Sequence, residues 1–253
     1  MRLDHVTYLP MFRTRFAHIR AHSTDQTRLD CLSLMRSTAQ SVSVITTVLH
    51  PSSETRGVLK PVYHGATLSS FASVSMYPYP VVAFALRTPS RMANSLWDTQ
   101  RACDRFKPHM VINLLSASQA QQALQFSRPR EFRHPFASTP YFLSQEHIPV
   151  LRGSLGALSC VLIRSLPLDN VHAPSLERQE GSSTRRSGTS GEQGSELFLA
   201  RVLRVETEVK AATQESEHAL PLVYYRQQYV TVQDAESLLP PGSLDSDQNT
   251  RTP

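Results

Sequence analysis

The chain has 253 residues, of which 40% are hydrophobic and 19% are charged, a composition typical of globular proteins. No run approaches the ~18 apolar residues that a transmembrane helix requires, so we expect no membrane span. The formal net charge of +5 comes almost entirely from arginines that are scattered rather than grouped, and we therefore expect no nucleic-acid partner.

Arginine alternates with apolar residues over roughly the first 25 positions, where Asp4 is the only acid before Asp25. Such a segment resembles a mitochondrial presequence. Asp4 and Pro10 both disfavour an amphipathic helix here. The alternative is a basic extension that has no targeting role. We assign residues 1–27 to a targeting or disordered N-terminal extension and expect a mitochondrial location, or otherwise a cytoplasmic one.

Apolar patterns after this extension predict mostly strands. In chain order, the expected elements are a helix over 29–39, strands over 42–48, 62–68, 81–86 and 109–115, a helix over 118–126, and strands over 155–163, 197–205 and 221–225. Because helices are few and no regular strand–helix alternation occurs, the pattern favours a mainly β, antiparallel barrel over a doubly wound parallel sheet.

Two segments are expected to lie outside this fold. Residues 181–191 contain no apolar residue, which predicts a disordered surface insertion over 176–196. Residues 234–253 contain Pro240-Pro241-Gly242 followed by a polar run, which predicts a disordered tail. The folded domain is therefore expected to span 28–233.

Cysteine and histidine form no pattern with metal-ligand spacing. Cys31, Cys103 and Cys160 lie far apart, and the ten histidines are dispersed. This usage indicates neither a zinc site nor a disulfide framework and is typical of a reducing compartment. We expect no metal.

Small hydroxyl side chains are concentrated where the predicted strand over 62–68 ends. Five of the nine residues from Thr67 to Ser75 carry a hydroxyl. Buried hydroxyls need partners, whereas hydroxyls at a strand end suit a ligand with several oxygens, such as a phosphate with a sugar chain. A serine-rich edge strand that faces water is the alternative.

Several segments, in order, resemble the flavin reductase-like family over residues 34–229. They are SVSVITT at 41–47, GATLSSFASVS at 65–75 followed by Pro80, VINLLS at 111–116 with Gln119 and Phe126, PVLRGSLGAL at 149–158, and PLVYY at 221–225 with Tyr229. The resemblance implies an FMN-binding split barrel, which is an antiparallel split β-barrel with a few short helices. It also implies an oxidoreductase that binds flavin as a homodimer and transfers a hydride from NAD(P)H to FMN, with FAD as the alternative flavin.

One position departs from the family pattern. The family often has Gly-Asp-His before the strand that is predicted here over 197–205, whereas this chain has Gly194-Ser195-Glu196. In the family that histidine lies near the flavin and the nicotinamide. The departure favours an alternative function, a flavin-binding protein with an assembly or binding role and no NAD(P)H reductase turnover.

The resemblance places the flavin on the hydroxyl segment and on the turn after the strand over 81–86. Thr67, Ser69 and Ser70 would donate hydrogen bonds to phosphate or ribityl oxygens. Arg87 and Ser90 would complete the phosphate site, and a solvated strand end is the alternative for Arg87.

Four further residues are predicted near the flavin. Phe71 and Ser73 would line a slot for the isoalloxazine, and Arg128 would face the cofactor. Asn113 is an amide within an apolar strand, and either the flavin or a neighbouring backbone is expected to satisfy it. No catalytic acid–base pair is assigned, because the flavin ring itself accepts the hydride.

Aromatic residues at two places are expected to be structural. For Tyr224, Tyr225 and Tyr229 we expect cross-strand packing or a dimer contact, with flavin stacking as the alternative. We expect Trp97 to pack a short helix onto the barrel.

Overall fold

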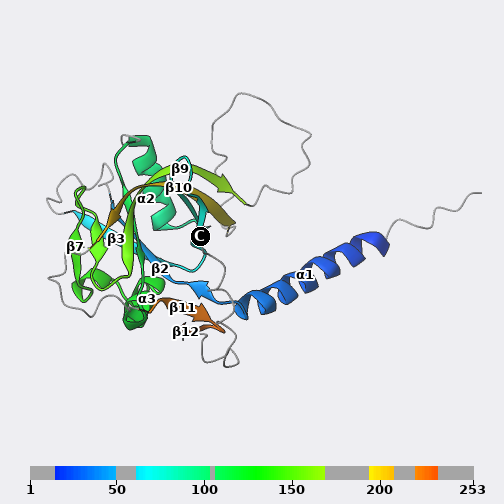
Figure 1. Ribbon diagram of the computed structural model, residues 1–253. Coiled ribbons are helices and arrows are strands. Elements are labelled where there is room, and N and C mark those ends of the chain that lie inside the picture. The colour runs from blue at the N-terminus through cyan, green and yellow to red at the C-terminus, as the bar shows by residue number, and fades with distance from the viewer. Residues whose placement is uncertain (1–14, 50–60, 103–105, 169–193, 208–219, 233–253) are drawn as a thin grey trace, which may run out of the picture. The chain divides into compact units, whose positions relative to one another are not determined.

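The computed structural model describes residues 15–49, 61–102, 106–168, 194–207 and 220–232 (Figure 1). The chain divides into two compact units, residues 1–39 with 225–228 and residues 40–224 with 229–253. The predicted tail over 234–253 and residues 176–193 of the predicted insertion lie outside the described residues.

The smaller unit is built on one long helix, α1 (Arg15–Arg36). The helix starts earlier than the predicted 29–39, and the expected boundary between residues 27 and 28 falls inside it. Residues 1–14 of the predicted N-terminal extension lie outside the described residues. The helix ends before Ser37 and Thr38, because the Thr38 hydroxyl donates a hydrogen bond to the Met35 carbonyl at 2.8 Å. Such local bonding competes with the regular helix pattern.

The larger unit contains a seven-stranded antiparallel sheet. In spatial order its strands are β3 (Val62–Leu68), β2 (Ser43–Leu49), β6 (Met110–Leu114), β9 (Gly156–Pro167), β10 (Gly194–Glu206), β5 (Val81–Thr88) and β4 (Ala72–Ser75). The two edge strands, β3 and β4, are consecutive in the chain. The prediction of a mainly β, antiparallel fold with few helices is confirmed.

The central strands are covered on both faces, which explains their apolar sequences. The first five residues of β2 and the first four of β6 are all buried. β-Branched side chains such as Val44 and Ile45 suit this environment, because they pack well on a pleated surface. The polar Asn113 in β6 is fully buried as well.

An aromatic stack fills the core between the sheet and helix α2 (Arg91–Ala102). The rings of Phe84 in β5 and Phe198 in β10 are nearly parallel, with centroids 5.5 Å apart. The Trp97 ring of α2 lies 6.2 Å from that of Phe198, so Trp97 packs a helix onto the sheet as predicted.

A second cluster of buried residues lies on the side of the sheet that faces helix α3 (Ala120–Ser127). Short elements complete it: the 3-10 helices Ala117–Gln119 and Pro135–Ala137, the two-stranded sheet of β7 (Tyr141–Leu143) and β8 (Pro149–Leu151), and the three-stranded sheet of β1 (Gln40–Ser41), β11 (Leu222–Tyr225) and β12 (Gln228–Thr231). The rings of Tyr224 and Tyr229 lie 5.4 Å apart and contact this cluster, so cross-strand packing is confirmed.

One boundary of the predicted insertion is wrong. Gly194, Ser195 and Glu196 were expected within the insertion over 176–196, but they form the start of β10 and pair with β5. The hydrogen-bonded ladder to Thr88, Arg87 and Leu86 outweighs the polar composition of these residues.

None of the described helices is long and apolar enough to cross a lipid bilayer.

We expect Phe84→Ala to lower the free energy of unfolding by about 3–5 kcal/mol, because it leaves a cavity beside the Phe198 ring. Urea-induced unfolding measures this loss. Phe84→Leu keeps most of the side-chain volume and should cost about 1–2 kcal/mol. An equal loss in the two variants would contradict the role of the ring stack in this core.

Candidate functional site

A pocket of about 620 Å³ opens where four elements of the larger unit come together. It lies between β3, the C-terminal end of β5, the start of α2 and the end of α3. Its lining residues are His64, Gly65, Ala66, Thr67, Leu68, Ser69, Ser70, Ala85, Leu86, Arg87, Ser90, Arg91, Met92, Phe126, Ser127 and Pro129. The volume is within the range of pockets that hold cofactors.

The Ser70 hydroxyl joins the two strand walls of this pocket. It accepts a hydrogen bond from the Ala85 amide at 2.9 Å and donates one to the Ala85 carbonyl at 3.2 Å. β3 and β5 are far from each other in the strand order, so no ladder joins them directly. The serine side chain just after β3 therefore makes the connection to β5 that backbone hydrogen bonds make between paired strands.

The start of α2 supplies backbone donors to the same pocket. Ser90 caps the helix, because its hydroxyl accepts a hydrogen bond from the Ala93 amide at 3.2 Å. The first amides of a helix lack partners within the helix, and its N-terminus carries a partial positive charge. This end of the pocket therefore favours an anion.

Two arginines stand beside this helix start. Arg87 and Arg91 are exposed and line the pocket, together with the exposed Ser69. Among the described residues, no hydrogen bond or ion pair engages either guanidinium or the Ser69 hydroxyl. Two uncompensated positive charges and a free hydroxyl thus converge with the helix N-terminus, which is a donor set that suits a phosphate.

His64 on β3 is the one lining residue with a strongly shifted pKa. Burial, with a smaller contribution from the positive charge of Arg91, lowers its pKa from 6.5 to about 4. The imidazole is therefore neutral near pH 7, so it can donate one hydrogen bond and accept another inside the pocket.

Five of the nine predicted site residues line this pocket: Thr67, Ser69, Ser70, Arg87 and Ser90. The structure gives them different tasks. The Thr67 hydroxyl donates to the Ala123 carbonyl of α3 at 2.7 Å, while Ser70 and Ser90 hold the backbone as described above. Ser69 and Arg87 are the two whose polar groups face no protein partner among the described residues.

The other four predicted residues do not line it. Phe71 packs against the core, and Ser73 is exposed on β4. Arg128 is exposed and pairs with Glu131 at 3.2 Å. The Asn113 amide donates to the Val44 carbonyl at 2.9 Å and accepts from the Leu151 amide at 2.8 Å. The structure therefore shows the backbone partners for Asn113, which was one of its two expected alternatives.

Eleven of the sixteen lining residues were not among the predicted site residues, and three of them, His64, Gly65 and Arg91, bear on how the pocket works. The sequence pointed to Arg91 only in general terms, because it is the second arginine in the segment Arg87-Thr88-Pro89-Ser90-Arg91. His64 and Gly65 begin the hydroxyl-rich segment, yet nothing in their local pattern indicates a pocket. Gly65 is required by packing, because a Cβ there would lie 2.6 Å from Cε1 of Phe126.

The departure from the family pattern lies beside this pocket. Ser195 pairs with Arg87 across the β5–β10 ladder, and Glu196 pairs with Leu86. The Glu196 side chain is buried, and its carboxylate accepts a hydrogen bond from the Trp97 indole at 3.2 Å. The position where the family often has a histidine is therefore occupied by a buried acidic side chain on β10, the strand that pairs with β5.

The lowered pKa of His64 predicts a pH dependence of stability. The folded chain holds this pKa at about 4, against 6.5 for an unperturbed histidine, so the unfolded state binds the extra proton between these values. As the pH falls through this window, His64 should remove up to about 1.4 kcal/mol of stability per pH unit.

His64→Gln removes this titration while keeping a polar side chain. We expect the variant to lose less unfolding free energy than the parent chain between about pH 7 and pH 4.5, as measured by urea unfolding. If both lose the same amount, the histidine is not held neutral by the fold.

Solved structures of other proteins share this fold. Nitrilotriacetate monooxygenase component B from Mycobacterium thermoresistibile is 18% identical, with a TM-score of 0.55 over 89% of this chain and 96% of that chain. The NADH:FAD oxidoreductase of Streptomyces globisporus, solved with NAD and FAD fragments, is 18% identical, with a TM-score of 0.54 over 82% of this chain and 94% of that one. The flavin reductase component of a bacterial two-component tryptophan halogenase is 20% identical, with a TM-score of 0.51 over 82% and 99% of the two chains.

A family model gives the stronger evidence. The model described as the flavin reductase like domain matches residues 35–233, which include every strand of the seven-stranded sheet and the whole pocket. The chain therefore belongs to the flavin reductase like domain family, and the predicted flavin reductase type of function is confirmed.

Proposed function

We propose that the pocket between β3, β5 and α2 holds the phosphate end of FMN, and that the chain is an NAD(P)H-dependent flavin reductase. The observation that carries the proposal is the pair of uncompensated guanidinium groups of Arg87 and Arg91 beside the capped start of α2. A phosphate monoester carries close to two negative charges, which two arginines and a helix N-terminus match.

The lining residues divide into a polar and an apolar part. Ser69, Arg87 and Arg91 would hold the phosphate, with the amides at the start of α2. Leu86, Met92 and Phe126 line the same pocket and are buried, so they offer an apolar surface to the remainder of the cofactor. The ligand would therefore be bound by charge at one end and by apolar contact along its body.

The flavin supplies a ring that accepts a hydride and passes electrons on, which leaves binding and orientation to the protein. The described lining contains no carboxylate, and His64 is neutral. This absence of acidic side chains suits an anionic, electron-rich ligand, because nothing in the described lining would repel it. FAD is the alternative cofactor.

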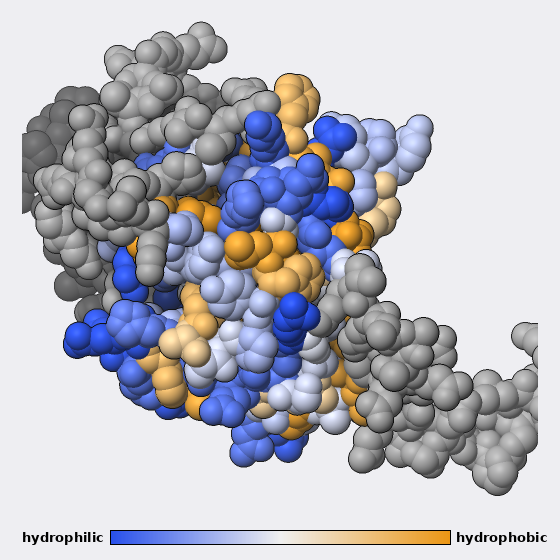
Figure 2. Space-filling view, turned by 90° about the vertical axis from the view of Figure 1, so that its left-hand side faces the viewer, coloured by the Kyte–Doolittle hydropathy of each residue, from blue (hydrophilic) through white to orange (hydrophobic). Residues whose placement is uncertain are grey.

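We also propose that the active form is a homodimer that covers the β4 edge. Val74, Met76 and Tyr77, on β4 and just after it, expose 57%, 64% and 88% of their surface. By contrast, the side that carries β7 shows apolar side chains only in small groups among hydrophilic ones where the described residues are visible (Figure 2). An edge strand with a cluster of large apolar residues is a surface that a second copy can cover.

Two broader proposals accompany this function. The seven-stranded sheet corresponds to the split barrel that the sequence resemblance implies, with β3 and β5 brought together by Ser70. The N-terminal segment directs the protein to mitochondria, which imaging of a fluorescent fusion would test against a cytoplasmic distribution.

A second candidate function is flavin binding without NAD(P)H turnover. The observation that favours it is Glu196, which stands where the family often has a histidine. An acidic side chain there replaces a basic one. Because the Glu196 side chain is buried and bonded to the Trp97 indole, this position offers no imidazole to an incoming nicotinamide.

The phosphate site predicts a graded loss of FMN affinity. Arg87→Met and Arg91→Met each remove one charge while keeping a long side chain, and each should weaken FMN binding about tenfold. Fluorescence quenching on titration with FMN measures the dissociation constant. Arg128→Met is the matched control, because Arg128 pairs with Glu131 outside the pocket and should leave affinity unchanged. A loss in the control alone would move the site to the end of α3.

Reductase turnover is tested without oxygen. FMN-loaded protein mixed with NADH or NADPH should lose the visible flavin absorbance, because a hydride reduces the ring. Bleaching with neither donor, while FMN still binds, would favour the second candidate function over the first. Glu196→His should then restore bleaching if the buried carboxylate is what prevents it.

A further inference from the structure

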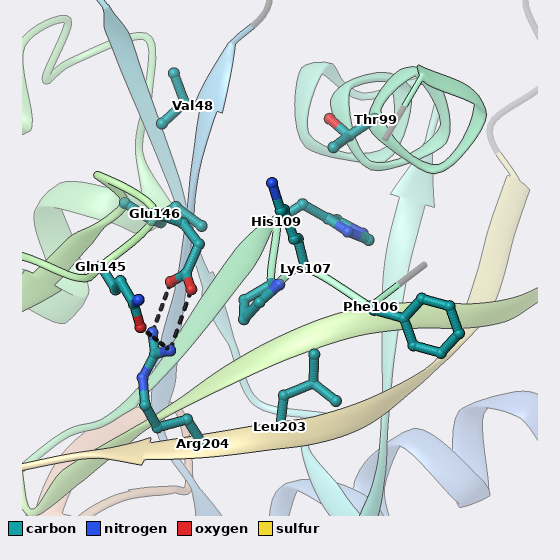
Figure 3. A pocket seen from close by; sticks show the side chains of 11 residues that line it. Val48, Thr99, Phe106, Lys107, His109, Gln145, Glu146, Leu203 and Arg204 are labelled. Carbon is teal, nitrogen blue, oxygen red and sulfur yellow. Dashed lines mark hydrogen bonds and ion pairs between the residues drawn. The ribbon is translucent and has the colours of Figure 1, made fainter. Parts of the chain in front are cut away.

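A second pocket, of about 750 Å³, opens at the other end of the same sheet. It lies between the end of β2, the C-terminal part of α2, the strand β10, the segment before β6 and the loop between β7 and β8 (Figure 3). Its lining residues are Val48, Thr99, Phe106, Lys107, Pro108, His109, Gln145, Glu146, Ile148, Leu203 and Arg204. None of these residues lines the first pocket.

Arg204, the arginine that lines this pocket, already donates its hydrogen bonds to other protein side chains. Arg204 contacts Glu146 at 2.6 and 3.1 Å and Glu206 at 2.6 Å, as the dashed lines to Glu146 show in Figure 3. It also donates to Gln145 at 3.1 Å. The hydrogen bonds and positive charge of Arg204 lower the pKa of Glu146, so this carboxylate is charged at neutral pH. The cluster of one arginine and two glutamates therefore carries a net charge of about −1.

Lys107 supplies the remaining positive charge. Among the described residues no carboxylate pairs with its ammonium group. His109 adds no charge in this arrangement, because its Nε2 accepts a hydrogen bond from the Leu162 amide at 3.2 Å and so carries no proton. A ligand with one negative charge would pair with Lys107, whereas Glu146 would repel a second negative charge.

The rest of the lining is apolar and held in place. Val48, Pro108, Ile148 and Leu203 provide apolar surface. The β7–β8 loop that forms one wall is closed by the Ser144 hydroxyl, which accepts hydrogen bonds from the Glu146 and Ile148 amides at 3.2 and 3.3 Å. The pocket is therefore preorganised, which reduces the entropy lost on binding.

We propose that this pocket is a second ligand site, which takes a small monocarboxylate with an apolar body and holds the carboxylate at Lys107. The apolar body would lie against Ile148 and Leu203. The site is independent of flavin binding, since the two pockets share no residue.

Isothermal titration of the full chain with benzoate tests the site. We expect saturable binding of one benzoate per chain and an affinity about tenfold lower for benzamide, which has the same shape without the charge. Lys107→Met should weaken benzoate binding about tenfold, while Arg164→Met, an exposed cation of β9 outside both pockets, should not. Leu203→Trp should abolish binding by filling the pocket, with retained folding checked by thermal unfolding.

Three results would overturn the proposal. They are no saturable binding up to about 10 mM benzoate, equal affinity in Lys107→Met and the parent, and loss of benzoate binding in Arg91→Met. The last would place the benzoate in the first pocket. Since FMN affinity is measured separately, failure here leaves the flavin proposal unaffected.

Discussion

The pair of hydrogen bonds between the Ser70 hydroxyl and the Ala85 backbone is the constraint on which the first pocket depends. β3 is an edge strand and β5 lies next to the opposite edge, so the sheet must curve strongly for the two to meet. The serine links them at the point where the chain leaves β3. Ser69 and Arg87, which lie close to this link in the chain, therefore line the same pocket.

The strands and their order of appearance could be predicted from the sequence because their patterns are local. The strand over 62–68 was predicted with its observed bounds, and continuous apolar runs identified β5 and β6. The four-residue β4 could not be predicted in the same way. It is short and mostly exposed, two of its four residues are serines, and its pairing with β5 depends on a partner that is not visible in its own sequence.

The site was predictable as a region, and less so in its details. The hydroxyl segment and the turn after β5 do line one pocket, but most of the hydroxyls hold backbone. Local sequence cannot tell a hydroxyl that faces a carbonyl from one that faces a ligand, because both need the same chemistry. The partners of Asn113 could not be predicted either, because they are backbone groups of strands that lie 69 and 38 residues away in the chain.

The two pockets use arginine in opposite ways. Arg87 and Arg91 keep their charge available, whereas Arg204 is surrounded by acceptors and serves as a structural tie between the β7–β8 loop and β10. The positive charge of Arg91 lowers the pKa of His64. An anion that neutralises Arg91 would relieve that repulsion and make the imidazole more basic. Ligand capture in mildly acidic solution would then be accompanied by proton uptake, and the heat released would vary with the ionisation enthalpy of the buffer.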